Sequence, residues 1–170
     1  MSDAHNGAGA REFPRGLRLV IVWLVIGTAV FLGVQALQAR AERARFSFDA
    51  ASGRIELRRG ADGHFHWPGR VNGVAVNFMV DTGATRTALP RALAREAGLV
   101  PDGSIRSSTA GGEVEGQLAR ADVMLQGGVA AERLRVAVLP QLDAPLLGMD
   151  IISKLRLSQA DGVLTLEVPR

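Results

Sequence analysis

The sequence contains no cysteine and no tyrosine, and it has only two tryptophans among its 170 residues. Without cysteine the chain forms no disulfide, and it has neither a thiolate nucleophile nor a cysteine-based metal site. It also lacks a basic patch, because residues 53–170 hold 14 basic and 13 acidic side chains. Proteins that bind nucleic acids concentrate positive charge on one face. The composition therefore argues against a nucleic-acid partner, and it leaves the redox compartment open.

One long hydrophobic segment lies near the N-terminus. Residues 19–34 contain no charged side chain, and the apolar stretch extends over residues 17–38. About 20 apolar residues in a helix span the hydrocarbon core of a bilayer. We therefore predict a transmembrane anchor at 17–38, preceded by a disordered tail at 1–16 and followed by a linker at 39–52.

A cleaved signal peptide is the alternative to an anchor. Its apolar region is usually shorter, about 7–15 residues, but the small-residue pattern of a cleavage site occurs at Ala39-Arg40-Ala41. Three arginines stand close to each end of the apolar segment, so the positive-inside rule does not decide its orientation.

From residue 53 onward the sequence predicts short strands joined by tight turns. Turn signals occur at Ala61-Asp62-Gly63, where we expect a hairpin, at Asn72-Gly73, where we expect a type I′ turn, and at Asp161-Gly162. Many short strands with regular turns are typical of an all-β barrel or sandwich. Residues 53–170 are therefore expected to form one all-β domain.

One or two short helices should interrupt the strands. The first is expected at 90–98, with Pro90 in its first turn and Gly98 at its C-terminal cap. A second short helix is expected after Gly148, with Asp150 as its N-cap. Between them, residues 105–125 predict a long hairpin with its tip at Ala110-Gly111-Gly112.

The segment that carries chemistry is FMVDTGATRTAL, residues 78–89, in which an apolar strand ends on Asp81. A turn is the structural interpretation, and a carboxylate positioned to activate water is the chemical one. Two carboxylates a few ångströms apart share one proton, so that one activates water while the other protonates a carbonyl oxygen. Gly83 lets the backbone approach the carboxylate and donate its N–H, and Thr82 is suited to bond an identical loop.

These residues resemble the retropepsin-like aspartic proteases, and most closely their bacterial, membrane-anchored, single-domain branch. The resemblance runs from about residue 55 to 168 and rests on DGHFHWPGRVNGVAVNFMVDTGATRTALP and PLLGMDIISKLRL. It implies a closed β-barrel of the kind that forms one half of an acid protease, with one or two short helices. It implies no cofactor and no metal, a protein or peptide substrate, and an inner-membrane location with the protease domain in the periplasm.

The resemblance also assigns roles to individual residues. Asp81 takes the catalytic role, with Thr82, Gly83 and Ala84 as the supporting loop. Leu146, Leu147 and Gly148 match the apolar-apolar-Gly element behind that loop, and Ala110, Gly111 and Gly112 fall where the family has its substrate-covering flap. Because Asp-Thr-Gly occurs once and no Asp-Ser-Gly occurs, a homodimer must supply the second aspartate. The alternatives are a peptide-binding or scaffolding β-barrel that has lost the chemistry and a structural envelope protein.

Other polar residues have simpler explanations. His64 and His66 lie two apart on an expected strand, but no third metal ligand is evident, so we interpret them as strand residues. Turn and cap roles account for Asp143 and Asp150. Residues 107–109, Ser-Ser-Thr, have no basic partner by spacing and are assigned to a flap strand.

Overall fold

The computed structural model describes residues 15–43, 45–50, 52–109 and 112–169. The chain divides into two compact units, Met1–Arg43 and Ala44–Arg170. Most of the tail expected at 1–16 lies outside the described residues. Residues 46–49, which fall in the segment expected to be a linker, form a strand instead.

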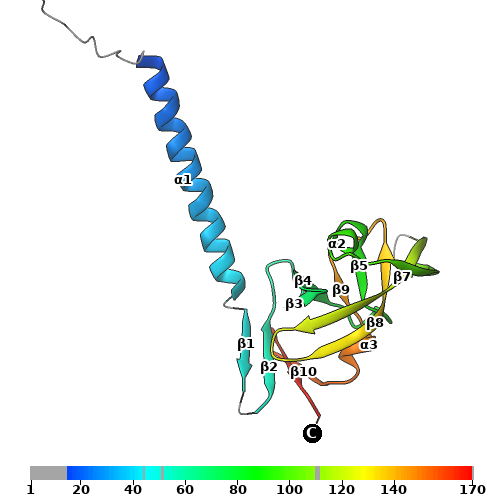
Figure 1. The fold of residues 1–170 in the computed structure, drawn as a ribbon. Coiled ribbons are helices and arrows are strands. Elements are labelled where there is room, and N and C mark those ends of the chain that lie inside the picture. Colours follow the sequence, from blue (N-terminus) through cyan, green and yellow to red (C-terminus); the bar gives the residue numbers. More distant parts are fainter. Residues whose placement is uncertain (1–14, 44, 51, 110–111, 170) are drawn as a thin grey trace, which may run out of the picture. The chain divides into compact units, whose positions relative to one another are not determined.

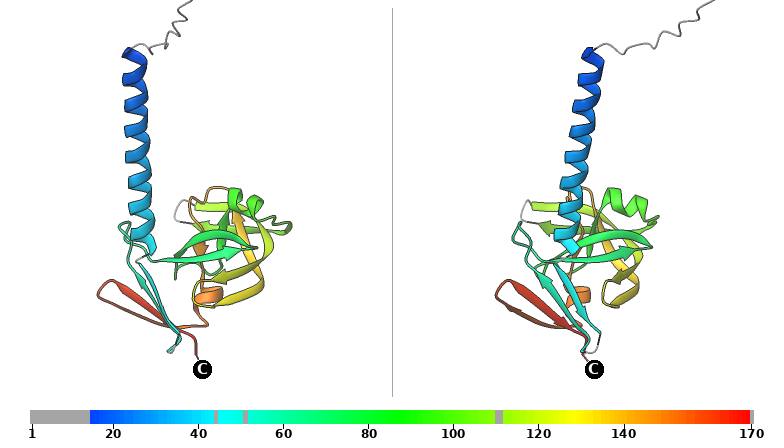
Figure 2. Two further views of the ribbon diagram at one scale, coloured as in Figure 1. Left: turned by 60° about the vertical axis from the view of Figure 1, so that its left-hand side comes forward. Right: turned by 90° about the vertical axis from the view of Figure 1, so that its left-hand side faces the viewer.

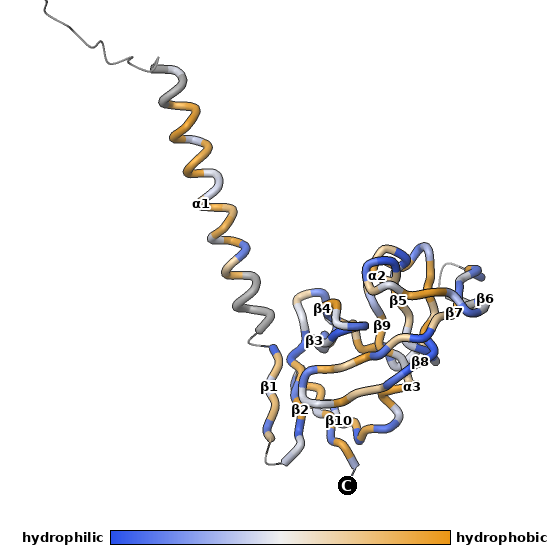
Figure 3. Tube along the Cα trace, viewed as in Figure 1, coloured by the Kyte–Doolittle hydropathy of each residue, from blue (hydrophilic) through white to orange (hydrophobic). Residues whose placement is uncertain are grey.

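The first unit contains one helix, α1 (Arg15–Arg43). Within it, Leu19–Leu37 has a mean hydropathy of 2.3 and is long and apolar enough to cross a membrane. Most of the central part of α1 is coloured as hydrophobic in Figure 3, with a paler stretch near its middle. Length and composition agree with a membrane span, and a signal sequence near the N-terminus satisfies the same criteria.

The second unit is built mainly of strands in two sheets (Figure 1). The four-stranded sheet has the order β1-β2-β11-β10. Its strands are β1 (Phe46–Asp49), β2 (Arg54–Arg58), β10 (Arg156–Ala160) and β11 (Val163–Glu167). All of its pairings are antiparallel, and β10 and β11 form the hairpin that turns at Asp161-Gly162, as predicted. Figure 2 shows this hairpin beside β1 and β2.

The larger sheet has the order β3-β4-β9-β5-β8-β7-β6. Its strands are β3 (His66–Val71), β4 (Val74–Val80), β5 (Ala88–Pro90), β6 (Pro101–Thr109), β7 (Gly112–Leu125), β8 (Ala130–Leu139) and β9 (Leu146–Leu147). An additional pairing joins β3, at one end of the order, to β7, the strand next to the other end, and closes the sheet into a ring. The predicted closed β-barrel is therefore confirmed, and β6 lies outside the closed ring as the first strand of the β6–β7 hairpin.

Two local predictions are confirmed by backbone geometry. Asn72 and Gly73 have φ of 47° and 88°, which are the positive values that a type I′ turn between β3 and β4 requires. Gly98 has φ of 65°, and it follows helix α2 (Arg91–Glu96) as a glycine at a helix C-terminus does.

Two other predictions are wrong. The turn at Ala61-Asp62-Gly63 does not close a hairpin, because β2 pairs with β1 and β11 while β3 pairs with β4 and β7. This turn carries the chain from one sheet to the other. Pro90 is the N-cap residue of α2 and the last residue of β5, with ψ of 145°, so it does not lie in the first turn of the helix.

One hydrophobic cluster is shared by the two sheets. Trp67 and Phe78, from the barrel, are fully buried, as are Ile55 and Leu166 from the four-stranded sheet. The indole N–H of Trp67 donates to the carbonyl oxygen of Gln126 at 2.8 Å, which satisfies its polar atom inside the core. The four-stranded sheet therefore packs against the barrel through a common core.

Closure of the barrel depends on a close approach at Gly69. A Cβ added there would lie 2.7 Å from the carbonyl oxygen of Met124 and 2.9 Å from Leu125 Cδ2. Gly69→Ala should therefore lower the free energy of unfolding by about 1–3 kcal/mol through overpacking. Ala75→Val, at an exposed position of β4, is the control and should change it by less than about 0.5 kcal/mol. Chemical denaturation of both variants measures the difference, and equal stabilities would contradict the tight closure.

Candidate active site

Asp81 follows β4 directly and begins the loop of residues 81–87 that connects β4 to β5. Strand β9 lies between these two strands, parallel to β4 and paired antiparallel with β5 at Ala88 and Leu146. The backbone N–H of Asp81 donates to the carbonyl oxygen of Leu147 at 3.0 Å. The main chain of the acid is thus fixed by β9, a strand more than 60 residues away in sequence.

The Asp81 carboxylate is held by its own loop. Its Oδ1 accepts the backbone N–H of Gly83 at 2.9 Å, as the sequence predicts. The N–H of Ala84 bonds the carbonyl oxygen of Asp81 at 3.3 Å. A Cβ at position 83 would lie 3.2 Å from Oδ1, so glycine allows this approach. Asp81 and Ala84 are partly buried, whereas Thr82 and Gly83 are exposed.

A second contact ties this loop to the short helix α3 (Met149–Ile152). The backbone N–H of Met149 donates to the carbonyl oxygen of Ala84 at 2.8 Å. Leu147 is fully buried behind the loop, while Leu146 is partly buried. The apolar-apolar-Gly element at 146–148 therefore lies beside the Asp81 loop, where the sequence places it.

Thr87, at the end of the loop, is a buried polar residue at the centre of a hydrogen-bond network. It has no exposed surface. Its hydroxyl donates to Asp150 Oδ1 at 2.8 Å, and its N–H donates to Asp150 Oδ2 at 2.9 Å. The same hydroxyl oxygen accepts the N–H of Gly148 at 3.2 Å. The Thr87 side chain thus connects the loop to Asp150 of α3 and to Gly148, which follows β9. Its hydroxyl donates one hydrogen bond and accepts another.

The N-cap role expected for Asp150 is wrong. Gly148 occupies the N-cap position of α3 without a side-chain cap bond, and Asp150 lies in the first turn. Its carboxylate is directed to Thr87 instead. Gly148 is required by space, because a Cβ there would lie 2.4 Å from the carbonyl carbon of Arg86. Sequence reasoning missed Thr87 and this use of Asp150, because the two residues are 63 positions apart.

The flap expected at Ala110-Gly111-Gly112 is described only in part. Residues 110 and 111 lie outside the described residues, and Gly112 is the first residue of β7, with φ of 109°. The strands on either side pair from Thr109 with Gly112 to Pro101 with Ala119. The predicted long hairpin is confirmed, and the covering role of its tip stays a prediction.

The histidines contribute a small acid–imidazole cluster outside the loop. His66 begins β3, whereas His64 precedes the strand, so only one of the two is a strand residue. Asp62 Oδ2 lies 2.7 Å from His66 Nε2 and 3.7 Å from His64 Nδ1. The hydrogen bond with His66 holds the pKa of Asp62 below its ordinary value. Among the described residues no group of three His, Cys, Asp or Glu side chains could hold a metal ion.

Asp143 lies in a bend before β9, in agreement with a turn role.

Comparisons with known proteins place this arrangement in a family. The model of the aspartyl protease family matches residues 67–151, from β3 to α3. A Sinorhizobium protein, "Uncharacterized protein in cobV 5'region", is 30% identical over 182 residues, which cover 90% of this chain and 75% of that protein. The crystal structure of a retropepsin-like aspartic protease from Rickettsia conorii is similar with a TM-score of 0.55 and 26% identity, covering 72% of this chain and 95% of that one.

A closed barrel that presents an Asp-Thr-Gly loop beside an apolar-apolar-Gly strand defines an acid-protease half with a retropepsin-like fold. The chain belongs to the aspartyl protease family.

The network around Thr87 gives a stability prediction. Thr87→Val keeps the shape of the side chain but leaves Asp150 Oδ1 and the Gly148 N–H without their partner. Loss of a partner for such groups costs about 1–3 kcal/mol, and the free energy of unfolding should fall by that amount. Thr85→Val is the matched control at an exposed position two residues away, where less than about 0.5 kcal/mol is expected. Denaturant titrations of both variants compare the two, and a neutral Thr87→Val would show that the network does not stabilise the loop.

Proposed function

We propose that this protein is an aspartic endopeptidase that acts as a homodimer, with one Asp81 from each chain. The observation that carries the proposal is the position of Asp81. It is a partly exposed carboxylate at the end of a barrel strand, fixed through its main chain by Leu147 and through its side chain by Gly83. Membership of the aspartyl protease family supports the same reaction class.

The chemistry follows from two neighbouring carboxylates that share one proton. The ionised Asp81 takes a proton from water as the water oxygen adds to the peptide carbonyl carbon. The protonated Asp81 gives its proton to the carbonyl oxygen, and a tetrahedral gem-diol forms. One gem-diol hydroxyl then gives its proton to the Asp81 that is now ionised. At the same time the Asp81 that took the water proton gives that proton to the amide nitrogen, and the carbon–nitrogen bond breaks. A carboxylic acid and an amine are released, and the pair again shares one proton.

The residues around Asp81 take supporting roles in this proposal. Thr82 is exposed, so its hydroxyl is available to bond the equivalent loop of the second chain. A symmetric dimer places such a loop opposite its own copy. The tip of the β6–β7 hairpin, Ala110-Gly111-Gly112, covers the substrate. An extended peptide pairs its backbone with strand edges, which gives affinity with little dependence on side chains.

For localisation we propose a bacterial inner-membrane protein with one span at residues 17–38 and its protease domain in the periplasm. The apolar length of Leu19–Leu37 supports the span. The orientation rests on the resemblance alone, because the flanking arginines are balanced. An anchor confines the chains to a plane and raises their effective concentration, which favours pairing.

Removal of the ionisable group tests the chemistry. Asp81→Asn keeps the shape of the side chain, and it should lower the rate of peptide cleavage by at least about 10²–10⁴-fold, the contribution of a general acid–base group. Cleavage of a mixed peptide library, followed by mass spectrometry, measures this. The control is Asp161→Asn, in the turn between β10 and β11, where asparagine also accepts the positive φ of 49°. Undiminished cleavage by the Asp81 variant would exclude this mechanism, and no cleavage by the wild type would favour a peptide-binding barrel.

Mixing of subunits tests whether the site is shared. When wild-type chains are titrated with Asp81→Asn chains at constant total concentration, mixed dimers carry only one ionisable aspartate. Activity per wild-type chain should then fall in proportion to the wild-type fraction. Subunit exchange is verified by energy transfer between differently labelled chains. If exchange is complete and activity per wild-type chain stays constant, the shared site is wrong.

A reporter fusion tests the orientation. Alkaline phosphatase is active only where its disulfides form, so its fusion after Arg170 should be active if the domain is periplasmic. A fusion of a cytoplasmic reporter at the same position should be inactive. The reverse pattern would place the domain in the cytoplasm and leave the chemistry of Asp81 unchanged.

A further inference from the structure

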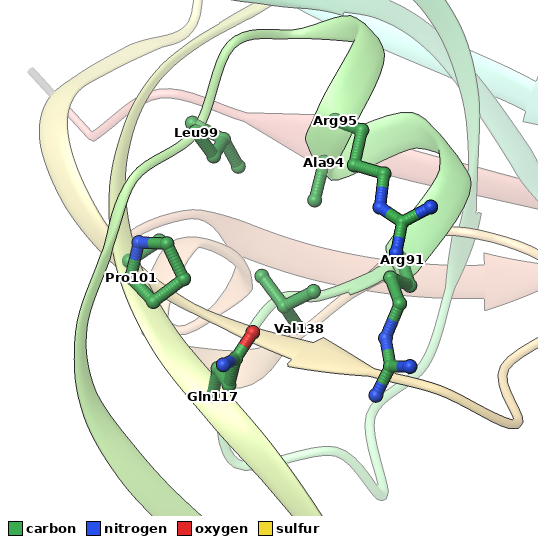
Figure 4. Close-up of a pocket in the computed structure, with 8 residues that line it drawn as sticks. Arg91, Ala94, Arg95, Leu99, Pro101, Gln117 and Val138 are labelled. Carbon is green, nitrogen blue, oxygen red and sulfur yellow. The ribbon is translucent and has the colours of Figure 1, made fainter.

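A concave pocket lies between α2 and the base of the β6–β7 hairpin (Figure 4). Its volume is about 400 Å³, within the range of roughly 300–1,000 Å³ that is usual for small-ligand pockets. None of its lining residues belongs to the Asp81 loop at 81–87. The pocket is therefore separate from the candidate active site.

One side of the pocket is apolar. Ala94 and Val138 are buried and form part of the hydrophobic core, so they give the pocket a fixed floor. Leu99 and Pro101 stand on the side opposite the arginines in Figure 4. An aliphatic group that enters this side leaves water for a preformed apolar surface.

The other side of the pocket is cationic. Arg91 and Arg95 are four residues apart on α2, so they project from the same face of the helix. Both are exposed, and neither has an ion pair or side-chain hydrogen bond within the described part of the chain. The residues that line the pocket include no acid. Two like charges one helical turn apart thus stand without a counter-ion.

Two arginines of the adjoining strands β7 and β8 have their charges paired with an acid. Arg120 lies 3.2 Å from Asp102, and Arg135 lies 4.0 Å from the same carboxylate. An acid therefore pairs with Arg120 on β7 and with Arg135 on β8, whereas Arg91 and Arg95 at the pocket mouth have none among the described residues. The pocket also contains Gln117, whose amide both donates and accepts hydrogen bonds.

We infer that this pocket binds the C-terminal carboxylate of a peptide that ends in an aliphatic residue. The carboxylate accepts hydrogen bonds from the Arg91 and Arg95 guanidinium groups, whose planar geometry suits it. The terminal aliphatic side chain occupies the wall formed by Leu99, Pro101 and Val138. The Gln117 amide bonds the last peptide group. Binding here does not require Asp81 chemistry, so it stands independently of the proposed protease function.

The test uses the full-length chain in detergent micelles and two peptides that differ in one group. Acetyl-Ala-Leu with a free carboxylate is compared with acetyl-Ala-Leu amide, and the dissociation constants come from NMR titration of the arginine side-chain signals. The free carboxylate should bind at least about tenfold more tightly than the amide, and added salt should narrow the gap. Acetyl-Ala-Gly with a free carboxylate should bind more weakly than acetyl-Ala-Leu, because it lacks the aliphatic side chain.

Variants locate the binding. Arg91→Gln and Arg95→Gln should each raise the dissociation constant of the free carboxylate by about fivefold, the upper range for an exposed charge pair. Arg156→Gln is the matched control, an exposed arginine on β10 that should change nothing. Equal affinity for acid and amide, equal effects of all three variants, or no binding up to the solubility limit would each overturn the inference.

Discussion

The buried hydroxyl of Thr87 joins the two parts of the chain that build the candidate site. It connects the end of the Asp81 loop to Asp150 and to the N–H of Gly148. Strand β9 has only two residues, and it pairs with β4 on one side and β5 on the other. The bond from the Gly148 N–H to Thr87 adds a contact at its end, and the main chain of Asp81 is in turn bonded to Leu147 of β9. Residues that touch no substrate in the proposed mechanism thus position the Asp81 loop.

A second constraint is the number of carboxylates. Within the chain Asp-Thr-Gly occurs once, whereas the proposed chemistry needs two carboxylates close enough to share a proton. A single ionised carboxylate is a weak base and offers no acid for the carbonyl oxygen. In the proposed mechanism the barrel therefore supplies half of a site, and the assembly of two chains is required for activity. The proposed N-terminal anchor fits this requirement, because confinement to a membrane raises the effective concentration of the chains.

The sequence predicts the local features of this fold better than the distant ones. Asn72-Gly73 and Asp161-Gly162 specify their turns through positive φ, and Gly83 specifies the bond to Asp81, because each depends on neighbours along the chain. The hairpin expected at 61–63 is wrong because the partners of β2 are β1 and β11, and pairing over such separations leaves no local signal. Asp150 was expected to cap its own helix, yet it bonds Thr87, 63 positions away. The resemblance identified the loop, and only the structure gave the contacts that support it.

The central claim is that one active site is formed by two chains. Isothermal titration calorimetry of the full-length chain with a peptide that carries a hydroxyl in place of the scissile carbonyl tests it directly. Such a peptide resembles the tetrahedral state and binds tightly only to a complete site. The account predicts one bound peptide for every two chains, with the binding lost in Asp81→Asn. One peptide for every chain, at a site that still requires Asp81, would contradict it.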